Sequence, residues 1–202
     1  MSDGGAGARR TPQRAQRELE SLAARLPSIA GAGFTLAIEN LAPVWPGPPR
    51  LCHSPARVRE LVDQLACSHV GMTFDVGHAH ITVDELGGEL APVLEGVRDA
   101  VVLFHLHDNF GARRQETVPG RLEPLRLDLH LPPGGGTLPW DAVAPSLLAH
   151  GAPLLLEVHP SHRPGPLGLA TVTTELLRRR APAVTASRPA VARAATARVP
   201  LG

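Results

Sequence analysis

The chain has 202 residues, a formal net charge of +1 and 43% hydrophobic residues, enough for one core of moderate size. The near-neutral charge argues against a nucleic-acid partner, and no apolar run approaches the ~20 residues of a membrane span. All twenty basic residues are arginine, which excludes Schiff-base lysine chemistry and a P-loop lysine.

Hydrophobic periodicity predicts helices and strands that alternate along the chain. Thr11-Pro12 and Ser54-Pro55 are typical helix starts, each with a capping hydroxyl before a proline. Helices are expected at residues 12–26, 55–65, 84–97, 139–150 and 166–180. Strands are expected at residues 34–39, 70–75, 101–105 and 153–157, with a loop at 76–81.

Alternation at roughly 30-residue spacing indicates parallel strands joined by crossover helices. A Rossmann-type sheet would need a G-x-G-x-x-G turn after its first strand, and the sequence contains none. The expected fold is therefore α/β, a partial TIM (β/α) barrel of about four to five β/α units.

Each expected strand ends in a side chain that can bind a metal: Glu39, Asp75, His105 and Glu157. The carboxyl ends of parallel barrel strands meet on one face, so these residues should converge. Asp128 and His130 stand two residues apart before a Pro/Gly-rich turn. Imidazole and carboxylate together suit a divalent metal ion.

Composition suggests three segments. Residues 1–10 are expected to be disordered, residues 11–180 to form the barrel, and residues 181–202 to be a disordered Ala/Pro/Arg-rich tail. The N-terminus lacks an apolar signal core, and two unpaired cysteines suggest no disulfide framework. The expected compartment is the cytoplasm.

Five motifs occur together, and jointly they resemble the xylose isomerase-like TIM-barrel superfamily over about residues 12–180. They are IEN (38–40), TFDVGHAH (73–80), FHLHDN (104–109), DLHLPPGGGTLPW (128–140) and LLLEVHP (154–160). That superfamily contains sugar and sugar-phosphate isomerases, keto-sugar epimerases and endonuclease IV-type DNA repair enzymes.

The resemblance implies that Glu39, Asp75, His105 and Glu157 ligate one divalent ion, commonly Mn, Mg, Co or Zn. It further implies that the two glutamates move a proton next to the carbonyl of a small sugar or sugar phosphate. Three further residues match positions that contact substrate or hold another metal in parts of the superfamily: His78, Asp128 and His130.

Structural explanations also exist for these residues. An acid at a strand end can cap the next helix, as Asp75 could. Glu39 is a poor cap, and its successor Asn40 could take that role instead. His105 could be a hydrogen-bonded core histidine, and Asp128 and His130 could be plain loop residues. A carboxylate directly after Leu154–Leu156, as Glu157 is, has no such explanation unless it is paired or metal-bound. His107 and His159 lie two residues after proposed ligands, so either could support the site if strand geometry continues that far.

The chain is short for this fold, because a complete eight-unit barrel takes about 250 residues. Only four strands are expected here, and the first strands of the superfamily have no counterpart. Two alternatives to a sugar isomerase or epimerase therefore stay open. One is an endonuclease IV-like zinc phosphodiesterase acting on abasic DNA, and the other is a non-catalytic truncated barrel. Self-association of two half-barrels would cover the open sheet.

Overall fold

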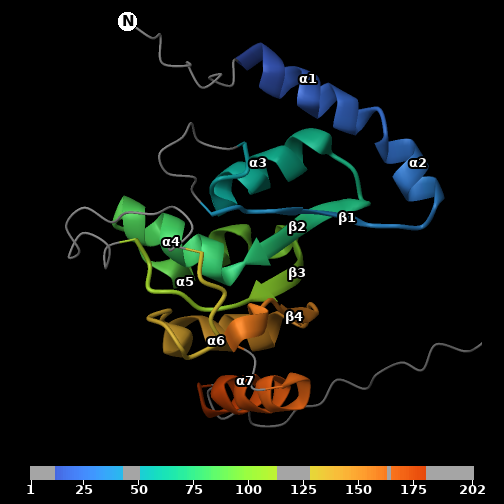
Figure 1. The fold of residues 1–202 in the computed structure, drawn as a ribbon. Helices are drawn as coiled ribbons and strands as arrows, with labels where there is room; N and C mark the ends of the chain where they lie inside the picture. The colour runs from blue at the N-terminus through green and yellow to red at the C-terminus, as the bar shows by residue number, and fades with distance from the viewer. Residues whose placement is uncertain (1–11, 43–50, 113–127, 163–164, 181–202) are drawn as a thin grey trace, which may run out of the picture.

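A computed structural model describes residues 12–42, 51–112, 128–162 and 165–180 (Figure 1). The strands are β1 (Leu36–Glu39), β2 (Val70–Asp75), β3 (Val101–Leu106) and β4 (Leu154–Leu156). The helices are α1 (Pro12–Ala23), α2 (Leu26–Gly31), α3 (Pro55–Leu65), α4 (Val76–Leu86), α5 (Leu90–Val97), α6 (Trp140–His150) and α7 (Pro166–Arg180). The segments predicted to be disordered, 1–10 and 181–202, lie outside the described residues.

The strands form one parallel sheet in the order β1-β2-β3-β4, so each strand pairs with the next one along the chain. Helices connect and flank these strands, which confirms the predicted α/β fold of a partial TIM barrel (Figure 1). Among the described residues no helix combines the length and apolar character needed to cross a membrane.

The segment after β2 differs from the prediction. Residues 76–81, expected as a loop, begin α4, because the Asp75 side chain caps that helix by accepting a hydrogen bond from His78 N at 2.7 Å. The helix expected at 84–97 is in fact two helices. The chain turns at Gly87, whose φ of 73° lies in the left-handed region that favours glycine.

The first expected helix is also divided. α1 ends at Ala23, and Pro27, the residue just after the expected helix 12–26, lies in the first turn of α2. A proline is tolerated there because the backbone N–H that it lacks would have no partner within the helix.

The hydrophobic core lies between the sheet and the helices on one of its faces. The Phe74 and Phe104 rings from β2 and β3 pack edge to face with centroids 6.2 Å apart, and Trp140 of α6 is buried in the same cluster. Because side chains alternate along a strand, the residues between these core positions point to the opposite face. His105 lies between Phe104 and Leu106, both core residues, and so faces away from the helices.

Asp108, just after β3, organises the loop that leads into α6. Its buried carboxylate accepts hydrogen bonds from Gly134 N at 2.9 Å, Leu138 N at 3.2 Å and Trp140 Nε1 at 2.8 Å. Its backbone pairs with Leu131 in an isolated bridge. These contacts hold the loop after Asp128 and His130 across the carboxyl end of the sheet.

Asp108→Ala should lower the free energy of unfolding by about 3 kcal/mol, because it leaves buried N–H donors without an acceptor. Urea denaturation followed by circular dichroism measures this. Asp63→Ala is the matched control, since Asp63 is exposed and, among the described residues, pairs with Arg59 one helical turn away, so the change should cost less than about 0.5 kcal/mol. Equal losses in the two variants would contradict the role assigned to Asp108.

Candidate metal centre

The four strand-end residues converge at the carboxyl end of the sheet. Ligand atoms of Glu39, Asp75, His105 and Glu157 all lie within 4.8 Å of one another. His105 is at the centre, with Nδ1 3.3 Å from Glu157 Oε1, 3.4 Å from Glu39 Oε1 and 3.8 Å from Asp75 Oδ2. We refer to these four residues as the strand-end cluster.

The hydrogen bonding of the strand-end cluster fits a bound cation. Asp75 Oδ2 and His105 Nδ1 are buried and have no hydrogen-bond partner. A buried polar atom without a partner is costly, and a divalent ion would satisfy both atoms at once. The helix-cap explanation for Asp75 holds as well, because its other oxygen, Oδ1, caps α4. Oδ1 therefore caps the helix, and Oδ2 is left facing His105.

Asn40 fixes the spacing between the first two ligands. Its side chain donates to Asp75 O and accepts from Asp75 N, both at 2.9 Å, so the end of β1 is tied to the end of β2. Asn40 is almost completely buried. The sequence suggested only a helix-capping role for Asn40. The IEN motif does not show that the Asn40 side chain would hydrogen-bond to the backbone of Asp75.

A second group of ligand-type side chains lies beside the first: His78, His107, Asp128 and His130. His78 Nδ1 is 2.9 Å from Asn40 O, and His78 Nε2 is 3.3 Å from Asp128 Oδ2. His130 has the same arrangement, with Nδ1 2.7 Å from Glu157 O and Nε2 3.1 Å from Asp128 Oδ1. We refer to these residues as the histidine cluster.

The backbone contacts in the histidine cluster orient both imidazoles. A carbonyl oxygen can only accept, so Nδ1 of His78 and of His130 carries the proton and donates it. The Nε2 atom of each ring then faces Asp128. Metal-bound histidines are usually held in this way, with the second ring nitrogen donating to a backbone carbonyl or carboxylate.

His107 connects the two clusters. It is fully buried, its ring stacks on that of His130 with centroids 3.9 Å apart, and its Nε2 lies 3.0 Å from Asp75 Oδ1. A side chain at Gly77 would collide with this ring, since a Cβ there would lie 2.1 Å from His107 Cε1. The sequence predicted only a supporting role for His107. The spacing of two from His105 on β3 was the signal that it shares the same face.

Charges in the histidine cluster are strongly coupled. Burial by itself would lower the pKa of His78, but hydrogen bonds to Asp128 and Glu39 raise that pKa to about 11. A hydrogen bond to Asp128 raises the pKa of His130 to about 8. Burial opposes ionisation of Asp128, yet His130 and His78 hold its pKa well below the usual range. Without a metal, the raised pKa values favour protonated His78 and His130. Their positive charge then lies beside Asp128, where a metal cation would also be favoured.

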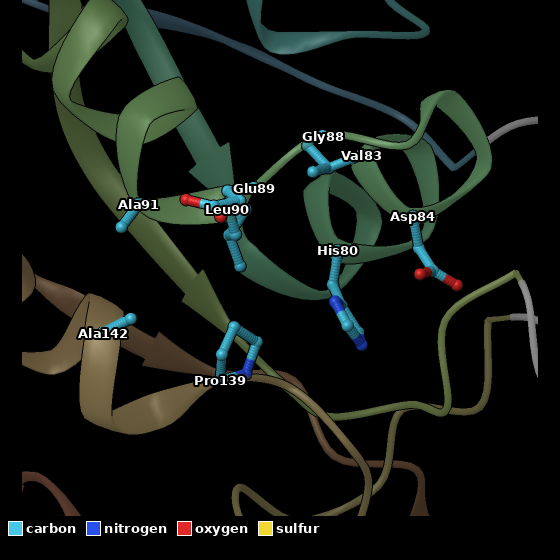
Figure 2. Close-up of a pocket in the computed structure, with 9 residues that line it drawn as sticks. All are labelled: His80, Val83, Asp84, Gly88, Glu89, Leu90, Ala91, Pro139 and Ala142. Carbon is cyan, nitrogen blue, oxygen red and sulfur yellow. The ribbon is translucent and has the colours of Figure 1, made fainter.

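A separate pocket lies away from both clusters. Figure 2 shows its lining residues, which come from α4, the turn into α5, the start of α5 and the residues around the start of α6. His80 points into this pocket, and burial lowers the pKa of its imidazole. None of the strand-end or histidine cluster residues lines it.

Comparison with known proteins gives a consistent result. A family model described as xylose isomerase-like TIM barrel matches residues 3–179. No curated protein matches the chain. Among solved structures, the chain is similar to a D-tagatose 3-epimerase-like protein at 20% identity, with a TM-score of 0.58, over 80% of this chain and 54% of that one.

Two other similar structures are relevant to the site. One is 3-keto-D-glucoside 4-epimerase from E. coli, at 19% identity and a TM-score of 0.55, over 84% of this chain and 56% of that one. The other is the IOLI protein with a bound zinc atom, at 18% identity and a TM-score of 0.58, over 80% of this chain and 55% of that one. These likenesses show a shared fold, and the chain spans just over half the length of each protein.

In metal-free protein, the free energy of unfolding should fall as pH rises from about 6.5 through about 8. The folded pKa of His130 is raised from 6.5 to about 8, so its contribution is complete below about 6.5 and is lost as the proton leaves. The raised pKa of His78 extends the decline to higher pH.

Urea denaturation in EDTA at several pH values measures this slope. Asp128→Asn should flatten it, because the charge that raises both histidine pKa values is gone. The exposed His162, changed to Gln, is the control and should leave the slope unchanged. An unchanged slope in Asp128→Asn would contradict the coupling.

Proposed function

The chain belongs to the xylose isomerase-like TIM-barrel family, and from that membership we propose that it is a divalent-metal-dependent sugar or sugar-phosphate isomerase or epimerase. The observation that supports this most directly is the strand-end cluster, in which three carboxylates and one imidazole lie together and two of their buried atoms, Asp75 Oδ2 and His105 Nδ1, have no hydrogen-bond partner. Such a set neutralises a divalent ion such as Mn, Mg, Co or Zn. The metal is part of the proposal.

The four residues would have different roles in this reaction. Asp75 is fully buried and His105 nearly so, which suits ligands that only hold the ion. The side chains of Glu39 and Glu157 are 29% and 33% exposed, so a substrate can reach them. When bound, the ion would polarise a substrate carbonyl and acidify the neighbouring C–H.

We assign the proton transfer to Glu39 and Glu157. They stand at the ends of the two outermost strands of the sheet, with His105 Nδ1 between their carboxylates. One carboxylate would remove a proton from carbon, and the other would return one from its own side of the site. The similar structures described as sugar epimerases support a sugar carbonyl compound as the substrate class.

The histidine cluster supports a second metal position. Three imidazoles and one carboxylate form a donor set of the kind that zinc prefers, and two of the rings are already oriented by backbone carbonyls. We therefore propose that His78, His107, Asp128 and His130 bind a second ion, or contact substrate when that ion is absent.

A two-metal arrangement would also suit phosphodiester hydrolysis, so an endonuclease IV-like phosphodiesterase is the second candidate function. The histidine cluster is the observation that favours it. The net charge of +1 weighs against it, since DNA-binding surfaces are typically strongly basic. A barrel without catalytic activity is the third alternative.

Glu157→Gln should weaken Mn²⁺ binding at least about tenfold and reduce turnover about 10²–10⁴-fold, because one ligand and one proton-transfer group are lost together. Titration calorimetry with Mn²⁺ measures the binding. Isomer formation from a panel of ketoses and ketose phosphates, followed by NMR, measures the turnover. Glu60→Gln is the control, since Glu60 on α3 is exposed and its ion pair within the part of the chain that the structure describes is with Arg57.

Folded wild-type protein that binds Mn²⁺ and converts no sugar in the panel would contradict the isomerase assignment. Incision of a duplex with an abasic site under the same conditions would favour the phosphodiesterase instead. Absence of both activities would favour the barrel without catalytic activity.

His130→Gln should reduce bound zinc from two ions per chain to one, because it removes a single ligand of the histidine cluster and none of the strand-end cluster. Elemental analysis after dialysis against limiting zinc gives the stoichiometry. His162→Gln serves as the matched control and should retain both ions. One ion per chain in wild type, unchanged in His130→Gln, would rule out the second metal.

A further inference from the structure

The first turn of α4 carries His78 of the histidine cluster, and the chain just after β3 holds this turn in place. The preceding residue, Gly77, is buried. Its carbonyl oxygen accepts a hydrogen bond from Asn109 Nδ2 at 2.9 Å. The ring of His107 fills the space that a side chain at Gly77 would take. Because His107 and Asn109 are two residues apart in extended chain, both side chains meet the same turn.

Asn109 joins α4 to two other segments. Its side chain is fully buried. Nδ2 donates to Gly77 O, while Oδ1 accepts from Gly111 N at 2.9 Å. Its backbone oxygen accepts from Thr137 N, also at 2.9 Å, in the loop before α6. Asn109 therefore ties the start of α4 to the loop that follows the Asp128 and His130 side of the histidine cluster.

Gly77 leaves the space that the His107 ring needs. A Cβ at this position would lie 2.1 Å from Cε1 and 2.4 Å from Nδ1 of that ring, well inside van der Waals contact. The fully buried ring has little room to retreat, because it stacks on His130 with centroids 3.9 Å apart and holds Nε2 3.0 Å from Asp75 Oδ1. Gly77 is helical, so close packing and not an unusual φ accounts for the glycine.

The contacts of His78 depend on where this turn lies. Its backbone N–H donates to Asp75 Oδ1 at 2.7 Å. Its ring nitrogens lie 2.9 Å from Asn40 O and 3.3 Å from Asp128 Oδ2, both outside α4. A shift of the turn by about 1 Å would stretch these contacts beyond hydrogen-bond length. The ring can face Asp128 only while the turn stays against the end of β3.

We propose that Gly77 and Asn109 are positioning residues for the histidine cluster. Both act through His78, because they fix the turn that holds its ring against Asp128. The inference rests on the proposed function only for what His78 then binds, a second ion or the substrate. Groups that orient metal ligands typically change metal affinity about 10–100-fold when they are replaced.

Asn109→Asp tests the hydrogen bond to the turn. At about pH 8 an ionised carboxylate still accepts from Gly111 N, but it has no proton to donate to Gly77 O. Thr82→Val is the matched control. Thr82 is also a buried polar residue of α4, and its hydroxyl donates to His53 O at 3.1 Å, away from the first turn.

Gly77→Ala tests the packing against His107. Alanine normally stabilises a helix relative to glycine, so the collision with the ring predicts an effect opposite to helix propensity. Gly96→Ala on α5 is the matched control, because a Cβ at Gly96 would meet nothing within 4 Å. That change should not disturb the cluster.

The reactivity of the His78 ring toward diethyl pyrocarbonate, resolved by mass spectrometry on metal-free protein in EDTA, measures its release. His150 is the internal reference, since its ring bonds to Arg98 O and Ala152 N away from both clusters. The ratio of the His78 rate to the His150 rate should rise at least about tenfold in Asn109→Asp and in Gly77→Ala. Both controls should keep the wild-type ratio.

Zinc titration of the same proteins adds a functional measurement. The affinity for the second ion should fall about 10–100-fold in Asn109→Asp and Gly77→Ala, although neither change removes a ligand. Thr82→Val and Gly96→Ala should bind both ions as the wild type does. Circular dichroism verifies that each variant is folded.

Three results would overturn the proposal. The first is an equal acceleration of His78 and His150, which would show a general loss of stability. The second is an unchanged reactivity of His78 in both test variants. The third is a second zinc bound as tightly as in wild type. If wild type binds a single zinc, the second metal of the proposed function is wrong, and the reactivity of His78 decides the positioning by itself.

Discussion

The buried charge of Asp75 is the constraint on which the carboxyl end of the sheet depends. An ionised carboxylate without water is costly unless its oxygens have partners. Oδ1 meets the backbone N–H of His78 and the ring of His107, and these contacts, acting against the cost of burial, lower the pKa of Asp75. Oδ2 has no hydrogen-bond partner and faces His105. That remaining oxygen is the clearest structural sign of a cation site.

The two clusters around Asp75 depend on each other. His78 contacts both Glu39 and Asp128, and His107 lies between Asp75 and the ring of His130. A proton or a metal ion in one cluster therefore changes the electrostatic potential in the other. In metal-free protein the histidines take up protons, so metal binding should release protons and strengthen as pH rises.

Strand positions could be predicted because each strand is a short apolar run that ends in or beside a ligand-type residue. The helix after β2 was missed because VGHAHI has no helical apolar stripe, and only the capping contact of Asp75 explains its start. Asn40 and Asp108 were missed for a related reason. Their partners are backbone groups 26 to 35 residues away, which local spacing cannot indicate.

The central claim is that the strand-end cluster holds one divalent ion, and its single imidazole makes this directly measurable. Electron spin echo spectroscopy of protein loaded with one equivalent of Mn²⁺ detects nitrogen bonded to the metal. Coupling to one histidine nitrogen, abolished by His105→Ala and retained in His130→Gln, is the predicted result. Coupling to several nitrogens would place the ion in the histidine cluster, and no coupling would contradict the strand-end site.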